Sequence, residues 1–187
     1  MTNNPYAPPS TPVADVDRSE LVDQSNPYFA VGLVKLFIMT LVTFGLYEVY
    51  WFYRHWRLVK ARDRSDIWPI PRAIFAVFFV YQLFNRMRSD GEENHVPGGL
   101  AAGPLATVFI IFNVLWRAPE PYSFLSFVTV AILIVAQKYA NQVNLAAAPD
   151  HDRNAGFSGW NWFGIVVGGL LWVLAAIGLM LPDGVSG

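Results

Sequence analysis

Long stretches without a single charged residue limit the folds open to this chain more than any other feature. Charge-free stretches cover residues 96–116, 121–137 and 154–182. A bilayer core about 30 Å thick is crossed by about 20 helical residues, so each stretch is a credible transmembrane helix. A further apolar stretch, 29–53, contains only Lys35 and Glu48 as charged residues. We therefore expect an all-α integral membrane bundle with four transmembrane helices, at residues 29–53, 96–116, 121–137 and 159–182.

The composition agrees with a membrane environment. Charged residues make up 14% of the chain and hydrophobic residues 54%, whereas soluble domains carry about 25% charged residues. The chain contains no cysteine, which excludes disulfides and thiolate metal sites. The formal net charge of −1 carries little information about partners, because the charges are segregated along the chain.

The segment 72–86 fits two descriptions. It contains 13 uncharged residues between Arg72 and Arg86, a length typical of re-entrant or interfacial segments, although a fifth span is the alternative. Cytoplasmic loops are rich in lysine and arginine. Four spans place ten basic residues inside and two outside, whereas five spans place seven inside and five outside. The charge distribution therefore favours four spans, with the amino-terminal tail outside and the basic segment after residue 53 in the cytoplasm.

The remaining segments are tails. Residues 1–27 are polar and rich in proline, which predicts a disordered amino-terminal tail. The helical membrane domain is expected at residues 28–182, and residues 183–187 form a short carboxyl-terminal tail.

Four charged residues are candidates for a binding site, namely Lys35, Glu48, Arg54 and Arg72. In a continuous helix from residue 29, Glu48 lies near the inner edge of the bilayer, among tyrosines and tryptophans that prefer this depth. We interpret it as marking the end of a span. Lys35 lies roughly 9 Å inside the outer edge, from where a lysine side chain can reach water. The other spans offer only scattered polar residues such as Asn113 and Thr129, which do not form a polar pathway.

A stripe of small residues runs along the last apolar segment. Gly164 and Gly168 form a GxxxG motif, and Ala175 and Gly178 extend it at helical spacing. Small residues let helices approach closely in membranes. The stripe is expected to pack against a neighbouring helix of the same chain, with a second copy or another membrane protein as the alternative.

Motifs for catalysis or metal binding are missing from the sequence. The histidines His55, His95 and His151 have no HExxH spacing, and neither phosphate-binding nor nucleophile motifs occur. We place His55 in the basic belt at the membrane surface. We therefore expect no enzyme, no metal site and no cofactor. The basic run after residue 53 directly follows an apolar segment, which indicates membrane-surface binding and not nucleic acid.

The string TFGLYEVYWFY, at residues 43–53, resembles a motif of small bacterial multi-pass membrane proteins of unknown function that share a DUF4234-like domain. The stretches PRAIFAVFFVYQLF and PEPYSFLSF are similar to later parts of that group, and the similarity covers most of residues 26–182. The resemblance implies a bacterial inner-membrane protein and brings no catalytic or ligand residues.

Two functions are compatible with these observations. The first is a non-enzymatic accessory component of the bacterial inner (cytoplasmic) membrane, acting through the lipid bilayer or other membrane proteins. The alternative is a small transporter or channel subunit, in which Lys35, Glu48 or Arg72 faces a polar cavity inside the bundle. Charges that face a cavity inside the bundle favour the transporter or channel, whereas charges that face lipid headgroups or water at the membrane edges favour the accessory component.

Overall fold

The computed structural model describes residues 26–119 and 122–180, and every regular element in these residues is helical, which confirms the all-α expectation there. Most of the predicted amino-terminal tail, residues 1–25, and the whole predicted carboxyl-terminal tail lie outside the described residues. The described α-helices are α2 (Leu33–Val42), α3 (Leu46–Asp63), α4 (Pro69–Ile74), α5 (Ala76–Glu93), α6 (Ala102–Val114), α7 (Thr129–Ala147) and α8 (Gly159–Met180). Two 3-10 helices, η1 (Leu115–Arg117) and η2 (Tyr122–Val128), lie between α6 and α7.

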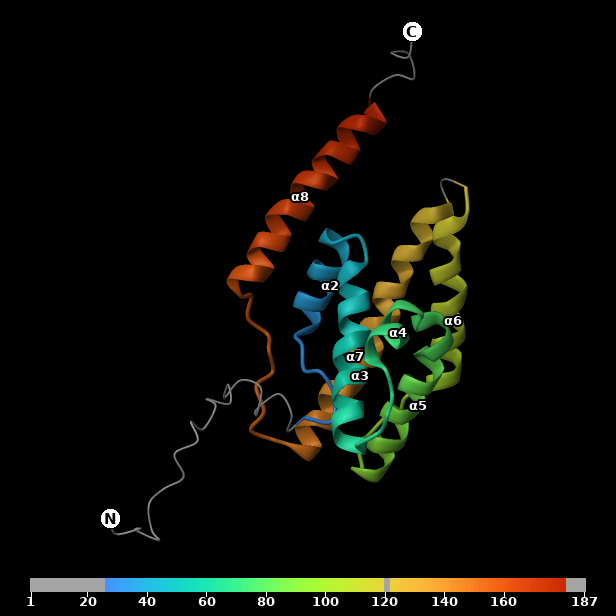
Figure 1. The fold of residues 1–187 in the computed structure, drawn as a ribbon, viewed down its shortest axis with the longest axis vertical. Helices are drawn as coiled ribbons and strands as arrows, with labels where there is room; N and C mark the ends of the chain where they lie inside the picture. Colours follow the sequence, from blue (N-terminus) through green and yellow to red (C-terminus); the bar gives the residue numbers. More distant parts are fainter. Residues whose placement is uncertain (1–25, 120–121, 181–187) are drawn as a thin grey trace, which may run out of the picture.

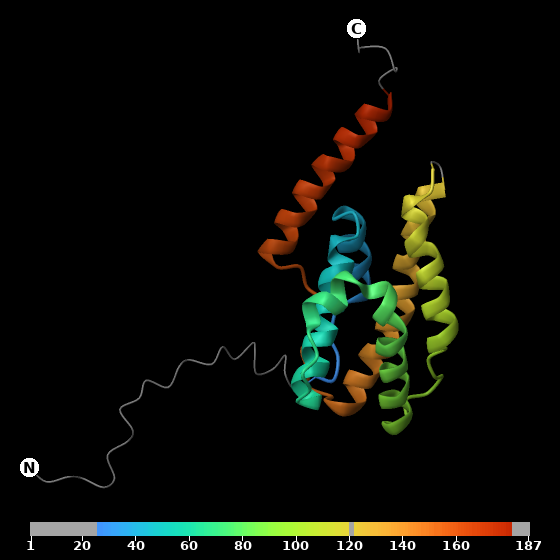
Figure 2. The same cartoon turned by 45° about the vertical axis from the view of Figure 1, so that its right-hand side comes forward.

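Five of the described α-helices form two hairpins and a long single helix. Helices α4 and α5 connect the hairpins, with α4 packed against α3 and α5 against α6 and α7. Figure 1 shows α2 running up to a turn from which α3 runs back down, and α6 and α7 forming a second hairpin. In Figures 1 and 2, both hairpin turns and the carboxyl end of α8 point the same way, and we call this the turn end. The carboxyl ends of α3, α5 and α7 lie at the opposite end. We call it the charged end, because α3 and α5 finish there in residues rich in arginine, aspartate and glutamate.

The single long helix expected at residues 29–53 is wrong, because a turn divides it into α2 and α3. Phe44 and Gly45 have left-handed backbone angles, with φ of 51° and 86°. The Gly45 N–H donates a 2.9 Å hydrogen bond to the carbonyl of Thr40, a pattern that closes helix carboxyl ends. The chain then folds back, so that the ring of Phe29 lies 5.8 Å from the ring of Tyr50. An average over hydropathy does not detect such a turn.

The other expected segments also differ in their bounds. The doubtful segment 72–86 contains the end of α4 and the first half of α5, with a break at Phe75. The segment 96–116 becomes α6, which is too short to cross a membrane alone, followed by η1. In the segment 121–137, η2 comes first, and α7 continues to Ala147.

Within the described residues, one helix is long and apolar enough to cross a membrane by itself, instead of the four expected. It is α8, whose apolar stretch Gly159–Gly178 is only 6% buried. In the stretches 29–53 and 96–116, helices are joined to turns and loops that are equally uncharged, so α2, α3 and α6 are each shorter than the apolar stretch in which they begin. The stretch 121–137 ends inside α7.

The segment before α2 is held by amide side chains of α7. Asn144 donates to the carbonyl of Tyr28 at 2.8 Å and accepts from its N–H at 2.9 Å. Gln137 donates to the carbonyl of Phe29 at 2.9 Å, and Asn141 donates to the carbonyl of Val31 at 3.0 Å. The three amides share one face of α7 because they follow one another at intervals of four and three residues. They satisfy buried backbone groups that belong to no helix or sheet.

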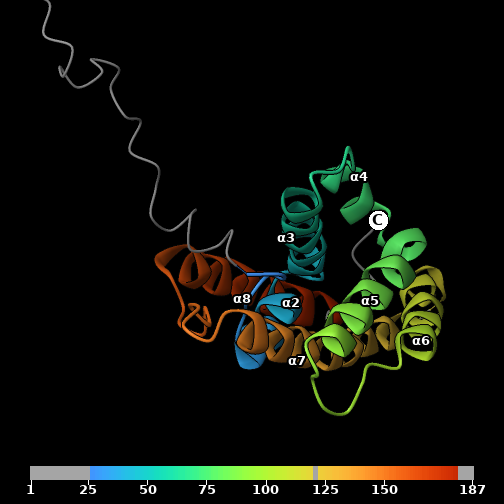
Figure 3. The same cartoon turned by 90° about the horizontal axis from the view of Figure 1, so that it is seen from below.

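Helix α8 docks against the first hairpin through its small residues. A Cβ atom at Gly168 would collide with the carbonyl oxygen of Val42, and one at Gly164 would lie 3.5 Å from Met39. Trp172 donates to the carbonyl of Leu41 at 3.0 Å. Figure 3 shows α2 between α3 and α7, and α8 also packs against it. The amino-terminal half of the predicted stripe, Gly164 and Gly168, therefore makes an intramolecular contact.

The carboxyl-terminal half of the stripe has a different environment. Ala175 and Gly178 are exposed, and a Cβ atom at Gly178 would meet nothing within 4 Å.

Candidate functional site

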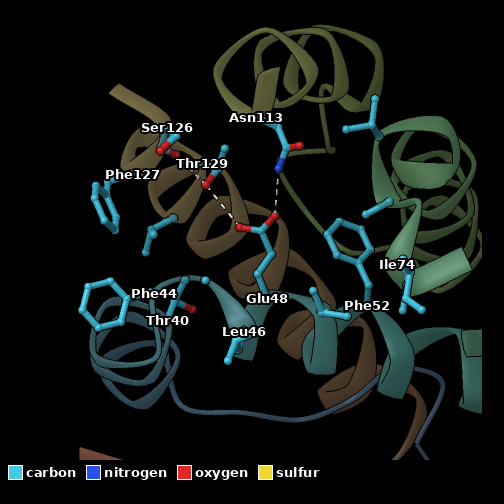
Figure 4. A pocket seen from close by; sticks show the side chains of 16 residues that line it. Thr40, Phe44, Leu46, Glu48, Phe52, Ile74, Asn113, Ser126, Phe127 and Thr129 are labelled. Carbon is cyan, nitrogen blue, oxygen red and sulfur yellow. Dashed lines mark hydrogen bonds between the residues drawn. The ribbon is translucent and has the colours of Figure 1, made fainter. Parts of the chain in front are cut away.

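A pocket of about 500 Å³ lies between the first hairpin, the α4–α5 junction, α6 and the start of α7. Figure 4 shows side chains from all of these elements around it. Most of the lining is apolar, and the polar lining side chains are Thr40, Glu48, Asn113, Ser126 and Thr129. The pocket is therefore an apolar space with a small polar group on one side.

Glu48 is the ionisable residue of this pocket. It sits in the first turn of α3 and is 9% exposed. Its carboxyl oxygens lie 3.3 Å from the amide nitrogen of Asn113 and 3.2 Å from the hydroxyl of Thr129 (Figure 4). The turn at Gly45 aims the start of α3 at α6 and α7, which brings together residues 65 and 81 positions apart.

The hydroxyl of Thr129 has two acceptors and only one hydrogen to donate. It lies 2.8 Å from the carbonyl of Ser126 and 3.2 Å from Glu48. Because this one hydrogen is shared between two acceptors, Thr129 cannot give Glu48 a full hydrogen bond while it also donates to Ser126. A neutral Glu48 fits its surroundings, because burying an ionised carboxylate without a cation is costly.

Lys35 has no part in this pocket. It is 5% exposed, and its ammonium group donates to Asn154 Oδ1 at 2.7 Å and to the carbonyl of Gly156 at 2.8 Å. Lys35 therefore binds the loop that leads to α8. The expectation that its side chain extends to water and needs no partner in the protein is wrong.

The arginine candidates also lie apart from Glu48. The guanidinium of Arg54 lies 4.7 Å from the ring centre of Phe29, and that of Arg72 lies 4.5 Å from the ring centre of Trp56. Neither arginine lines the pocket of Glu48. Of the four predicted candidates, only Glu48 lines this pocket.

His55 is fully buried, and the expectation that it lies in an exposed basic belt is wrong. Its ring centre lies 4.1 Å from that of Trp51, and its Nε2 lies 3.3 Å from Gln137 Oε1. Because the chain reverses at residues 43–45, the face of α3 that carries His55 lies against α7. A continuous span at residues 29–53 does not predict this contact.

An ion-pair network at the charged end was not expected from the sequence. Arg62 donates to Asp90 at 2.5 Å, Tyr28 donates to the same carboxylate at 2.5 Å, and Arg86 pairs with Asp63. Burial raises the pKa of Asp63, but its hydrogen bonds and charge interactions with Arg62 and Arg86 outweigh that effect and hold the pKa below its usual range. The network ties α3 to α5. Only the density of charge after residue 53 hints at it in the sequence.

In the part of the chain that the structure describes, no three side chains among His, Cys, Asp and Glu gather as they would around a metal ion. The pocket of Glu48 has one carboxyl group, one amide and hydroxyl groups near it. Its chemistry is that of a binding site for a proton or a single positive charge.

Comparison with protein-family models, with curated proteins and with solved structures finds no match for this chain. The resemblance to proteins with a DUF4234-like domain stays a prediction.

Proposed function

We propose that the protein is a non-enzymatic, multi-pass component of a bacterial inner membrane that acts through contacts with lipids or other membrane proteins. The observation that carries the proposal is the surface of α8. This helix has 22 residues without a charge, and large apolar side chains such as Leu170 and Leu174 are more than 60% exposed. Its length, about 33 Å, matches a bilayer core of about 30 Å. An apolar surface of this extent is stable when lipid covers it.

The structure favours a different membrane arrangement from four continuous spans. In our proposal, α8 crosses the bilayer, and the α6–α7 hairpin, whose two arms are lengthened towards the turn by η1 and η2, crosses it as a pair. The α2–α3 hairpin enters from the charged end and returns without crossing. Exposed apolar residues near its turn, Phe44 and Leu46, support this placement. The basic residues of the charged end then lie in the cytoplasm.

Membrane fractionation tests this proposal. The full chain is expected to stay with the membrane after washes with high salt and with alkaline carbonate, and to enter solution only with detergent. Recovery of the folded chain in detergent-free buffer would refute the proposal. A variant with Leu170→Glu and Leu174→Glu should be released or degraded, because two charges on the lipid-facing side of α8 oppose insertion.

The pocket of Glu48 favours a second candidate function, a small transporter or channel subunit. That function needs an ionisable side chain in a cavity of the bundle, and Glu48 meets this condition. Arg72 does not line this pocket, and Lys35 lines a separate one together with Arg54. Ionisable groups in apolar membrane regions are typical of ligand and proton pathways. Ligand binding at Glu48 is the first property to test.

A further inference from the structure

Glu48 is surrounded by neutral groups. Its hydrogen-bond partners are an amide and a hydroxyl, and no lysine, arginine or histidine lines its pocket. The other charged residues of the surrounding helices lie outside the lining, for example Lys35, Arg54, Arg72, Arg86, Arg117 and Lys138. An ionised Glu48 would therefore lack a counter-ion from the lining residues, and a positively charged ligand could supply one.

The walls of the pocket suit an apolar cation. The rings of Phe44, Phe52 and Phe127 belong to the lining, together with aliphatic side chains such as Leu46 and Ile74 (Figure 4). A cation close to an aromatic face is attracted by the ring, most strongly when it has lost its water. A strongly hydrated metal ion would lose its water here and gain only one carboxylate. An organic cation with apolar substituents fits both the charge and the walls.

The pocket also opens towards apolar surface. Phe44, Leu46 and Ile74 belong to its lining and are 45%, 73% and 61% exposed. In the proposed membrane arrangement these residues lie near the lipid. The entry route therefore rests on the proposed function, whereas the binding chemistry does not.

We propose that this pocket binds a monovalent organic cation with apolar substituents in exchange for the proton on Glu48. The carboxyl group releases its proton to water, and the carboxylate that remains pairs with the cation. The net charge of the pocket stays neutral before and after the exchange. Asn113 donates its hydrogen bond to the carboxyl group in both states, and the lack of a basic group in the lining excludes anions.

Equilibrium dialysis of the purified full chain in detergent tests the proposal, with labelled tetraphenylphosphonium as the probe. Tetraphenylborate, which has the same shape and the opposite charge, is the matched control ligand. Glu48→Gln removes the charge and keeps the size of the side chain. Glu93→Gln, at an exposed position of α5, is the matched control variant.

The wild type and Glu93→Gln are expected to bind tetraphenylphosphonium at one saturable site, and Glu48→Gln should bind it about tenfold or more weakly, because its carboxylate is gone. Tetraphenylborate should show no saturable binding that depends on Glu48. Equal affinity of Glu48→Gln and the wild type, or equal binding of both probes, would overturn the proposal.

A second measurement needs only the wild type and guards against misfolding of Glu48→Gln. In weakly buffered solution, binding of tetraphenylphosphonium is expected to release one proton per cation, and the affinity should rise with pH. Saturable binding without proton release would refute the exchange. Failure of both binding tests by a chain that fractionates with the membrane would overturn the ligand site and leave the proposed membrane function intact.

Discussion

The ring of Phe29 lies 5.8 Å from the ring of Tyr50, with the two planes at 86°. The two residues stand on either side of the turn at residues 43–45, and their contact requires the chain to fold back. Both arms of the first hairpin therefore lead to the charged end. A continuous span at 29–53 would have placed these rings near opposite faces of the bilayer.

Replacing Gly45 by alanine is expected to destabilise the first hairpin. Gly45 has a φ of 86°, which costs other residues about 1–2 kcal/mol. No atom lies within 4 Å of a Cβ placed there, so the effect comes from the backbone alone. Thermal unfolding in detergent should show a lower midpoint for Gly45→Ala.

The control for that variant is Gly169→Ala. Gly169 lies in the interior of α8, and a Cβ there also meets nothing within 4 Å. Alanine is a better helix former than glycine by about 1 kcal/mol, so this variant should keep or raise the midpoint. An equal decrease in both variants would contradict the left-handed turn at Gly45.

Gly168→Ala is expected to weaken the docking of α8. The new methyl group would collide with the backbone of Val42, which cannot move as a side chain can. Overpacking of this kind costs about 1–3 kcal/mol. Limited proteolysis should cut the loop before α8 faster in this variant than in the wild type. Gly178→Ala, at an open position of the same helix, should leave the rate unchanged, and a faster cut there too would argue against a specific contact.

Asn144→Leu is expected to release the segment before α2. The change removes both hydrogen bonds to the backbone of Tyr28 and leaves its buried N–H and carbonyl without these partners. Each unsatisfied buried group costs about 1–3 kcal/mol. Hydrogen exchange at residues 28–31 should rise by at least about tenfold, as expected for a loss of 1.4 kcal/mol or more. Gln142→Leu on the same helix is the control, and an equal rise there would refute the role of Asn144.

Acid is expected to weaken the network at the charged end. The folded pKa of Asp63 lies below its usual value of 3.8, so its ionised form stabilises the fold above that pH, and this contribution is lost as pH falls through the folded pKa. Asp63→Asn should flatten the decline of the unfolding midpoint below about pH 4. Arg86→Gln, which removes a partner of Asp63, should flatten it partly. An acid limb that neither variant changes would contradict the network.

The sequence and the structure agree where a feature depends on local pattern. The helical class and the apolar α8 follow from long charge-free stretches, and the packing of Gly164 and Gly168 follows from their spacing. Hydropathy did not reveal the turn at Gly45, because its residues are as apolar as the helices beside them. The surroundings of Glu48 depend on this turn and on Asn113 and Thr129, which are remote in sequence. The sequence signal for this polar group was the presence of Asn113 and Thr129, two polar residues, within apolar segments.

Cysteine accessibility tests the central claim that the first hairpin enters and leaves the membrane on one side. The natural chain has no cysteine, so single cysteines can be placed by Ser10→Cys, Asp66→Cys and Ser186→Cys and probed in intact cells with an impermeant thiol reagent. Asp66 is exposed in the loop between α3 and α4. We predict that Ser10→Cys and Asp66→Cys are labelled only after the cells are opened, and that Ser186→Cys is labelled in intact cells. Labelling of Ser10→Cys in intact cells, with Asp66→Cys protected, would restore the continuous span and contradict the account.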